Sequence, residues 1–441
     1  MYYFIYFWHV MKLLRNGLLI LACVLFGCAP AWRISIPGQQ RGDGQPQSAG
    51  GSDSPALSER AGVANSDGLS GETDKVVRPG AARMERYLPL LRGKRLALVV
   101  NHTSVVDGVH LLDTLLSQGI HVSGILRVFV PEHGFRGDLD AGAEVESGTD
   151  PATGIPVVSL YGAHRKPLPG DLEGVDLVLY DIQDVGVRFY TYISTLHYVM
   201  EACAEQHVPL ILLDRPNPHG GYVDGPLLQS AYASFVGMHP IPVVYGLTPG
   251  ELARMINGEG WLAGGIRCDL TVIPCEHYHH GKTVPLPVAP SPNLNSGQAV
   301  MLYPSTCFFE GTVISEGRGT PWPFQVYGHP DLEGDFTFVP EPVPGMSSHP
   351  RLQGQLCRGA DLRNFNPPQG WNRIHLGWLL DAYEKYPRKE EFFTPYFEKL
   401  SGTGKLREQI VAGQDEKKIR RSWQRDLKRF RRKRTPYLIY R

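Results

Sequence analysis

A short turn in the first third of the chain carries the residue types that hydrolytic enzymes use. It contains, in order, Glu132, His133, Arg136 and Asp138, so a carboxylate, an imidazole, a guanidinium and a second carboxylate fall within seven positions. The apolar run of residues 122–130 directly before it is typical of a buried strand. Because ligands of open α/β sheets bind at the carboxyl ends of the strands, this turn is the first candidate for an active site.

Four other predicted strands also end in polar side chains. The polar segments that follow them are Asn101–Thr103, Tyr161–Gly162, Asp181–Asp184 and Asp214–Asn217. The carboxyl ends of parallel strands share one edge of a sheet, so five segments would deliver polar groups to one place. Polar residues also end strands without any function, but that explanation fits one or two turns better than five.

Apolar runs and segments of helical periodicity alternate through the middle of the chain. This alternation predicts a parallel sheet covered by helices on both faces, which is the α/β class. Thr248, Pro249 and Glu251 stand at the N-cap, N1 and N3 positions of a capping box, so Glu251 is expected to cap a helix rather than to catalyse. Helices are expected over residues 109–118, 191–206 and 249–257. Strands are expected over residues 95–100, 122–130, 156–160, 175–181, 208–213, 241–245 and 269–273.

The first 28 residues have the composition of an export signal. The basic stretch Met11–Arg15 precedes an apolar core at residues 17–26, and Cys28 follows Gly27. This arrangement resembles a bacterial lipoprotein signal, in which the cysteine becomes the lipidated first residue; an uncleaved membrane anchor is the alternative. Both predict that the rest of the chain is exported, and the lipoprotein signal predicts a lipid-anchored protein at the periplasmic or cell-surface side of a membrane.

Composition divides the remainder into a tether and two domains. Residues 29–84 are rich in glycine, serine, glutamine, aspartate and proline, which predicts a disordered tether with a reach of roughly 40 Å. Residues 85–285 hold the strand–helix alternation and form the predicted catalytic domain. Prolines at positions 285, 287, 290 and 292 indicate a crossing into an α+β domain, residues 286–441. The basic helix predicted near its end is expected to dock through Ile419, Trp423, Leu427 and Phe430.

Charge and glycine patterns exclude two classes of partner. Lys+Arg and Asp+Glu both number 44, so no net charge indicates nucleic acid. The first strand is followed by Asn101–Ser104 instead of a G-x-G-x-x-G motif, so the chain lacks a dinucleotide fingerprint.

A series of motifs spread along the chain is characteristic of one family. They occupy residues 131–138, 181–186, 188–192, 213–218, 290–293, 303–304, 310–312 and 315–320. Taken together and in order, these motifs resemble the bacterial exo-β-N-acetylmuramidase family of the NamZ type. The resemblance extends from about Leu91 to Tyr440, which is nearly all of the chain beyond the tether.

The resemblance implies a Rossmann-like parallel-sheet domain with a smaller α+β C-terminal domain that completes a cleft. It also implies an exo-acting glycoside hydrolase that releases N-acetylmuramic acid from the non-reducing end of peptidoglycan fragments, in cell-wall turnover and recycling. The expected partner is a muramyl-containing sugar, without a cofactor, a metal or nucleic acid.

Glycoside hydrolysis commonly uses a proton-donating carboxyl group and a second carboxylate across the sugar. Glu132 is the expected proton donor, and His133 is expected to orient it or to contact the sugar. An ion pair with Arg136 that fixes the turn is the alternative for Glu132. The candidates for the second carboxylate are Asp181, Asp184, Asp214 and Glu316. Without a suitable carboxylate, the substrate's own acetamido group would act as the nucleophile.

Muramic acid carries a lactyl ether whose carboxylate a planar guanidinium can bind with two hydrogen bonds. Arg188 and Arg318 are the first candidates for this contact, and Arg136 is the third. Tyr190 and Tyr192 are expected to pack against the sugar, with core packing as the alternative. The other candidates for substrate binding are Asn101, Asp214, Arg215 and Asn293. For the aspartate and arginine before Pro216, stiffening of the turn is the alternative.

Two other functions stay open from the sequence. The first is a metal-dependent hydrolase that uses Glu132, His133 and Asp181 as ligands. The second is a non-catalytic lipoprotein that binds cell-wall glycan in the same cleft.

Overall fold

The computed structural model describes residues 75–132, 134–135 and 147–440. The predicted signal with Cys28, most of the predicted tether, and His133, Arg136 and Asp138 of the turn lie outside these residues. No helix in the described ranges is long and apolar enough to cross a membrane.

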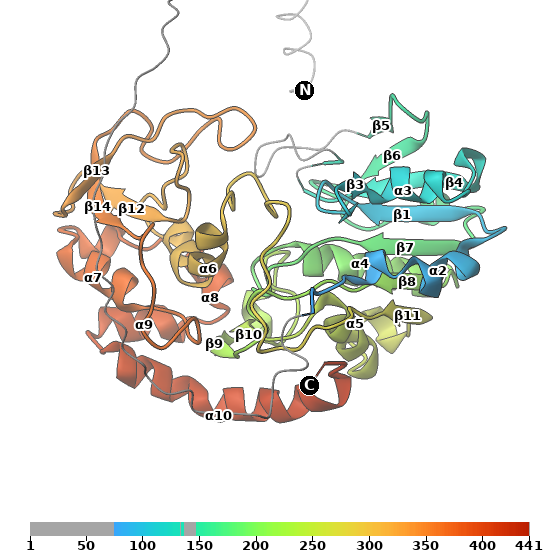
Figure 1. The fold of residues 1–441 in the computed structure, drawn as a ribbon. Coiled ribbons are helices and arrows are strands. Elements are labelled where there is room, and N and C mark those ends of the chain that lie inside the picture. The colour runs from blue at the N-terminus through green and yellow to red at the C-terminus, as the bar shows by residue number, and fades with distance from the viewer. Residues whose placement is uncertain (1–74, 133, 136–146, 441) are drawn as a thin grey trace, which may run out of the picture. The chain divides into compact units, whose positions relative to one another are not determined.

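A seven-stranded sheet forms the centre of the N-terminal half (Figure 1). Its order is β11-β8-β7-β1-β4-β6-β5, and all neighbours are parallel except β5 and β6. The strands are β1 (Leu96–Val100), β4 (Ile125–Val130), β5 (Gly148–Thr149), β6 (Pro156–Ser159), β7 (Leu177–Asp181), β8 (Leu210–Leu213) and β11 (Leu270–Ile273). This sheet confirms the predicted Rossmann-like α/β class.

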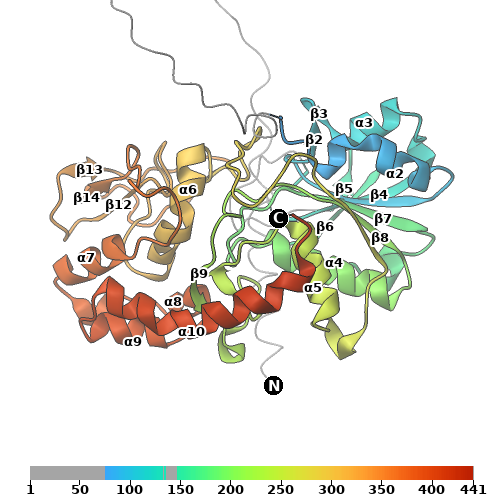
Figure 2. The same ribbon diagram turned by 60° about the horizontal axis from the view of Figure 1, so that its bottom comes forward.

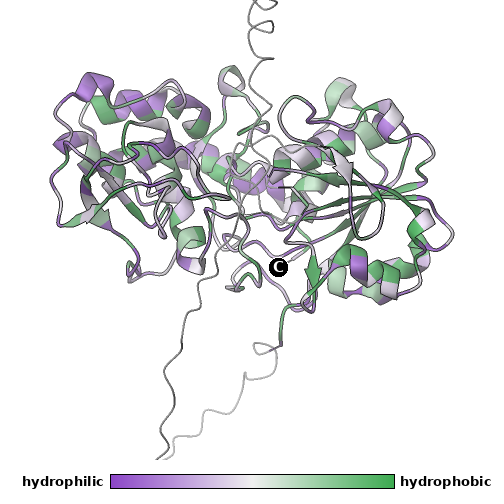
Figure 3. Cartoon of the chain, turned by 90° about the horizontal axis from the view of Figure 1, so that it is seen from above, coloured by the Kyte–Doolittle hydropathy of each residue, from purple (hydrophilic) through white to green (hydrophobic). Residues whose placement is uncertain are grey.

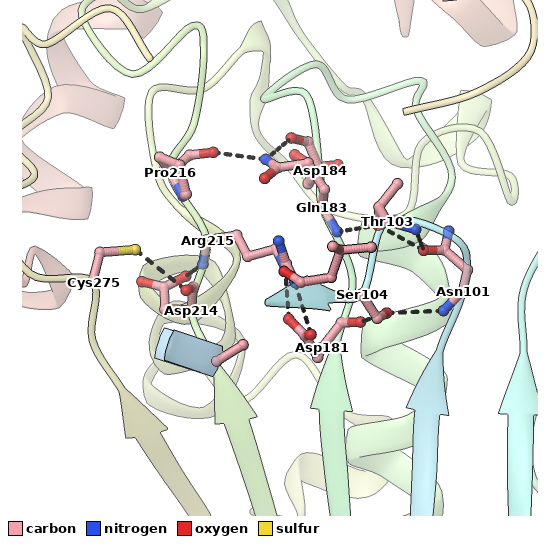
Figure 4. A network of polar contacts seen from close by, with 12 residues as sticks. Asn101, Thr103, Ser104, Asp181, Gln183, Asp184, Asp214, Arg215, Pro216 and Cys275 are labelled. Carbon is pink, nitrogen blue, oxygen red and sulfur yellow. Dashed lines mark hydrogen bonds and ion pairs between the residues drawn. The ribbon is translucent and has the colours of Figure 1, made fainter. Parts of the chain in front are cut away.

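The connections of the sheet diverge at its centre. The chain passes from β1 to β4 on one side of the sheet order and from β7 to β8 on the other. Ligands of open α/β sheets bind where such connections diverge, outside the carboxyl ends of the strands. All the parallel strands end at this edge. Figure 4 shows the polar residues that follow β1, β7 and β8 gathered there, as predicted.

Alternating side chains explain why helices cover both faces of this sheet. Leu96 and Leu98 of β1 pack with α2 (Met84–Leu91) and α3 (Leu111–Ser117), whereas Ala97 and Val99 pack with α4 and α5. Helix α4 spans Tyr192–Glu205, and helix α5 spans Pro249–Gly258. The strands are coloured mainly as hydrophobic in Figure 3, as expected for a sheet buried on both faces.

The predicted cap of α5 is confirmed. The Thr248 hydroxyl accepts a hydrogen bond from the backbone N–H of Glu251, and the Glu251 carboxylate accepts one from the backbone N–H of Thr248. The next predicted strand belongs to a separate pair: β10 (Pro242–Val244) runs antiparallel to β9 (Asp224–Leu227). A small hairpin, β2 (Val105–Val106) and β3 (Val109–His110), follows β1.

The C-terminal half is α+β, as predicted. Its sheet has the order β12-β14-β13 and is antiparallel throughout. The strands are β12 (Val326–His329), β13 (Phe336–Phe338) and β14 (Cys357–Asp361). The helices are α6 (Gly297–Thr306), α7 (Gly377–Lys385), α8 (Phe397–Ser401), α9 (Lys405–Val411) and α10 (Glu416–Arg434). The four apolar residues predicted to dock α10 are all buried.

The two halves share one hydrophobic core. A single cluster contains Val99 of β1, Tyr303 of α6 and Phe430 of α10. Figure 2 shows α10 running back from the C-terminal half toward α5, and its Arg420 binds Asp224 of β9 at 2.7 Å. A cut at residue 285 therefore does not separate two independent cores.

The predicted tether ends earlier than residue 84. The backbone of Arg78 pairs with that of Glu276, and the N–H of Gly80 donates to the carbonyl of Asp214 at 2.7 Å. Ala81 is fully buried. The last residues assigned to the tether therefore pack on the sheet domain.

Candidate active site

Asp181 and Arg215, at the ends of β7 and β8, bind each other. The guanidinium donates to both carboxylate oxygens, from Nε at 2.6 Å and from Nη2 at 2.8 Å (Figure 4). Both side chains are buried. The prediction that Asp181 is catalytic and that Arg215 binds substrate is therefore corrected: their paired charges tie two neighbouring strands together.

Asp214 is also structural. Its Oδ2 accepts hydrogen bonds from the hydroxyls of Thr248 and Tyr440, each at 2.7 Å, and its Oδ1 accepts one from the N–H of Gly250 at 2.8 Å. Burial raises the pKa of this carboxyl group to about 7. Asp214 therefore fastens the start of α5 and the C-terminal segment to β8, which corrects its predicted role in substrate binding.

Asp184 lies under the site and not on its surface. It accepts a hydrogen bond from the N–H of Gly186 at 2.6 Å and another from the hydroxyl of Tyr245. Burial raises its pKa to about 6, and its Oδ1 has no partner in the described part of the chain. Because the side chain is almost fully buried, direct attack on a sugar is not its role.

The burial of Arg188 contradicts its predicted contact with a substrate carboxylate. Its side chain is fully buried, and its guanidinium donates to the carbonyls of Pro226, Ile241 and Leu400 at 2.8–2.9 Å. These carbonyls belong to segments from both halves of the chain. Arg188 therefore joins the two halves and is not available to a substrate carboxylate.

Tyr190 and Tyr192 pack in the core, which was the alternative to their predicted contact with the sugar. Both are buried, and their rings meet edge to face at 4.8 Å. The Tyr190 hydroxyl donates to the carbonyl of Pro290 at 2.6 Å, while the Tyr192 hydroxyl donates to the backbone carbonyl of Glu132 at 3.4 Å. Through these bonds the two tyrosines position the turn after β4.

The two predicted asparagines are buried, and each keeps one free polar atom. Asn101 accepts hydrogen bonds at Oδ1 from the N–H and the hydroxyl of Thr103, while Asn293 donates from Nδ2 to the carbonyl of Met346. Nδ2 of Asn101 and Oδ1 of Asn293 have no partner among the described residues. Both side chains are at most 1% exposed, so their predicted contacts with sugar hydroxyls stay predictions.

Glu132 is half-buried at the end of β4, where the sequence places the reacting carboxyl group. Its Oε2 accepts a hydrogen bond from the hydroxyl of Thr191, the residue before α4, at 3.1 Å. Tyr161, which follows β6, lies beside the same carboxylate: burial and then Glu132 hold the pKa of this tyrosine above its usual value. The hydroxyls of Thr191 and Tyr161 thus both interact with Glu132.

A second carboxylate cluster comes from the C-terminal half. Arg318 donates to Oε1 of Glu310 from Nη2 at 2.6 Å and from Nε at 3.2 Å, and its Nε lies 3.1 Å from Oε1 of Glu316. Glu310 is half-buried, whereas burial raises the pKa of the nearly inaccessible Glu316. The paired acids occupy the guanidinium of Arg318, which leaves it less suited to the predicted contact with a substrate carboxylate.

A series of aromatic rings connects the surroundings of the two clusters. The rings of Tyr192, Tyr190, Tyr303 and Phe324 form a continuous series with centroid separations of 4.8, 6.1 and 4.9 Å, and Arg318 lies over Phe324 at 5.0 Å. The charge of Glu132 raises the pKa of Tyr161, and the charge of Arg318 lowers it. Burial is the main cause that raises the pKa of Tyr396 in the C-terminal half, and the charges of Glu310 and Glu132 raise it further. Charged groups from both halves of the chain therefore act on the same two tyrosines, Tyr161 and Tyr396.

Four residues of this region were not among the predicted site residues: Glu310, Thr191, Tyr161 and Tyr396. Glu310 belongs to one of the family motifs, and Tyr161 follows a predicted strand, so both left a signal. Within the described residues no three metal-binding side chains are grouped. Asp181, one ligand of the metal-dependent alternative, has both oxygens bound to Arg215.

Family models for the N-terminal and C-terminal parts of the exo-β-N-acetylmuramidase NamZ match residues 96–298 and 301–440. The chain belongs to the NamZ family. The peptidoglycan β-N-acetylmuramidase NamZ of Bacillus subtilis (strain 168) is 40% identical over 376 residues, which cover 80% of this chain and 89% of that protein. The two NamZ parts meet near residue 300, later than the predicted boundary at residue 285.

Two crystal structures of DUF1343 family proteins from Bacteroides fragilis NCTC 9343 share the NamZ fold seen here. One is 44% identical with a TM-score of 0.77, and the other is 28% identical with a TM-score of 0.72. Each match covers 83% of this chain and 99% of the other. The fold, with both of its parts, is thus common to the chain and these relatives.

Proposed function

We propose that this chain is an exo-acting glycoside hydrolase that releases N-acetylmuramic acid from the non-reducing end of peptidoglycan fragments. Membership of the NamZ family and the 40% identity to a peptidoglycan β-N-acetylmuramidase support this activity. The structural observation that carries the proposal is the position of Glu132 directly after β4, at the carboxyl edge of the sheet, where the hydroxyl of Thr191 binds its carboxylate at 3.1 Å.

Each of these residues has a role in the proposed reaction. Glu132 donates a proton to the leaving glycosidic oxygen as its bond to the anomeric carbon breaks, and Thr191 holds the carboxyl group in place at 3.1 Å. A water molecule adds to the anomeric carbon and loses a proton to a carboxylate of the site. Glu310, held by two donors of Arg318, supplies the negative charge that stabilises an oxocarbenium-like transition state. Buried Glu316, whose pKa is raised, lies behind Arg318 and sets the position of that guanidinium.

A chromogenic β-glycoside of N-acetylmuramic acid tests the activity. The purified protein should release the chromophore, and prior treatment with a metal chelator should not change the rate. Binding of the glycoside without release would favour the glycan-binding alternative, and loss of activity that added metal restores would favour the metal-dependent alternative.

We further propose that the protein is exported and lipid-anchored through Cys28, at the periplasmic or cell-surface side of the membrane. The support is the basic start, the apolar core and the cysteine of the first 28 residues. Expression in a bacterial host should place the full chain in the membrane fraction, and Cys28→Ala should move it out of that fraction. Retention of the variant in the membrane would indicate an uncleaved anchor instead.

A further inference from the structure

Arg165 presents a guanidinium that is held in place but has no acidic partner among the described residues. The residue lies in the connection after β6, and its Nε donates to the carbonyl of Gly162 at 2.9 Å. Its guanidinium carbon lies 4.6 Å from the centre of the Phe235 ring. No carboxylate in the described part of the chain pairs with it, and the side chain is exposed. The two Nη groups therefore remain open to a ligand.

The ring under Arg165 is itself fixed by α4. The backbone carbonyl of Phe235 accepts a hydrogen bond from the hydroxyl of Ser194 at 2.7 Å. The Phe235 ring stacks on Tyr198 with an interplanar angle of 11° and meets Tyr161 edge to face at 6.4 Å. These contacts make Arg165 and Phe235 a rigid shelf, because both are held by their own neighbours before any ligand binds.

Helix α4 also gives the position of this shelf relative to Glu132. Thr191, which binds Glu132, is followed by Ser194 and Tyr198 at spacings of three and seven residues, so all three lie on one face of the helix. At about 1.5 Å per residue, the shelf lies about 5 to 10 Å along the helix from Thr191. This is the scale of one sugar ring and its substituents.

Electrostatics links the shelf to the site. Burial and Glu132 raise the pKa of Tyr161, whereas Arg165 and Arg318 both oppose this rise. The Tyr161 hydroxyl therefore lies within the electrostatic reach of the reacting carboxylate and of both arginines. Of these arginines, Arg318 is bound to Glu310 and Glu316, while Arg165 has no acidic partner in the described ranges.

We propose that Arg165, supported by Phe235, binds the lactyl carboxylate of the N-acetylmuramic acid residue that is released. The inference rests on the proposed glycosidase activity and assigns the residue that distinguishes muramic acid from glucosamine. A planar guanidinium can bind a carboxylate through both Nη groups, and the Phe235 ring beneath Arg165 fixes the orientation of the guanidinium plane. N-acetylglucosamine has no lactyl group and gains nothing from this contact.

The test compares three chromogenic glycosides with the same leaving group: those of N-acetylmuramic acid, its lactyl amide and N-acetylglucosamine. Arg165→Gln should lower kcat/KM for the muramic acid glycoside by about 10- to 100-fold, mainly through KM, as loss of a charge-assisted contact predicts. The same variant should leave the other two glycosides unchanged. Arg254→Gln, at an exposed arginine of α5, is the matched control and should behave like the wild type.

The outcomes separate this inference from the proposed activity. A wild-type protein that releases nothing from the muramic acid glycoside contradicts the activity itself. A wild-type protein that prefers this glycoside, together with an Arg165→Gln variant that keeps the same preference, overturns the role of Arg165 alone. An effect of Arg165→Gln that appears only with longer glycan chains also overturns it, because the arginine would then bind a neighbouring sugar.

Discussion

The hydroxyl of Thr191 donates a hydrogen bond to Oε2 of Glu132 at 3.1 Å, although Thr191 is the N-cap residue of α4. Threonine at this position ordinarily satisfies an N–H of the first turn, but here the side chain makes no such bond. The hydroxyl instead connects the start of α4 to the end of β4. A residue that would normally stabilise a helix is thus used to orient a carboxylate.

Thr191→Val should therefore impair catalysis more than stability. The substitution keeps the shape of the side chain and removes the donor to Glu132, so kcat should fall about 5- to 30-fold, as expected when a contact worth about 1–2 kcal/mol is lost. KM should change little, and Thr191→Ser should restore kcat. Steady-state kinetics on the chromogenic muramic acid glycoside measure all three effects.

Thr248→Val is the control for the structural role of a capping threonine. Thr248 does cap its helix and also donates to Asp214, so its loss should lower the free energy of unfolding by about 1 kcal/mol or more. Urea unfolding should show this loss for Thr248→Val and only a small change for Thr191→Val. Equal destabilisation by both variants would mean that Thr191 acts through the fold.

Glu132→Gln and Glu310→Gln should each reduce kcat by about 100- to 10,000-fold, since both substitutions remove a charge or a proton that the reaction uses. Glu398→Gln is the matched control, because Glu398 also pairs with an arginine, Arg407 at 3.1 Å, and is similarly accessible, but lies in α8. Rates of the control should match the wild type. Full activity of Glu310→Gln would assign the second carboxylate elsewhere.

The sequence was informative about which elements meet and less so about which side chains remain available. Strand ends, the cap at Thr248 and the buried face of α10 depend on local patterns and were predicted correctly. The neutralisation of Asp181 by Arg215 depends on β7 and β8 being neighbours, which a polar residue at a strand end does not reveal.

Arg188 illustrates the same limit at a longer range. Its three carbonyl partners lie 38, 53 and 212 residues away in the sequence, so no local pattern distinguishes it from an arginine that binds substrate. Arg165 shows the reverse. It belongs to no motif in the sequence, and only the packing of Phe235 against α4 and Tyr161 shows that it is held beside the site.

Arg188→Met should destabilise the protein by at least about 3 kcal/mol, because three buried carbonyls lose their donor and the methionine cannot replace it. Urea unfolding at a single pH measures the effect. Arg165→Gln should lie within about 0.5 kcal/mol of the wild type, as expected for an exposed side chain. If Arg188→Met were stable and only raised KM, the arginine would be a substrate residue after all.

The stability of the protein should fall as the pH rises through the range in which Asp214 ionises. Burial raises the folded-state pKa of this carboxyl group to about 7, above its value of about 3.9 in an unfolded chain. The protonated form is therefore favoured by folding, and its contribution is complete below about pH 4 and lost toward pH 7. Urea unfolding between pH 4 and pH 8 should show this decline. The slope should be smaller in Asp214→Asn, which has no proton to lose, and an unchanged slope would show that other groups cause it.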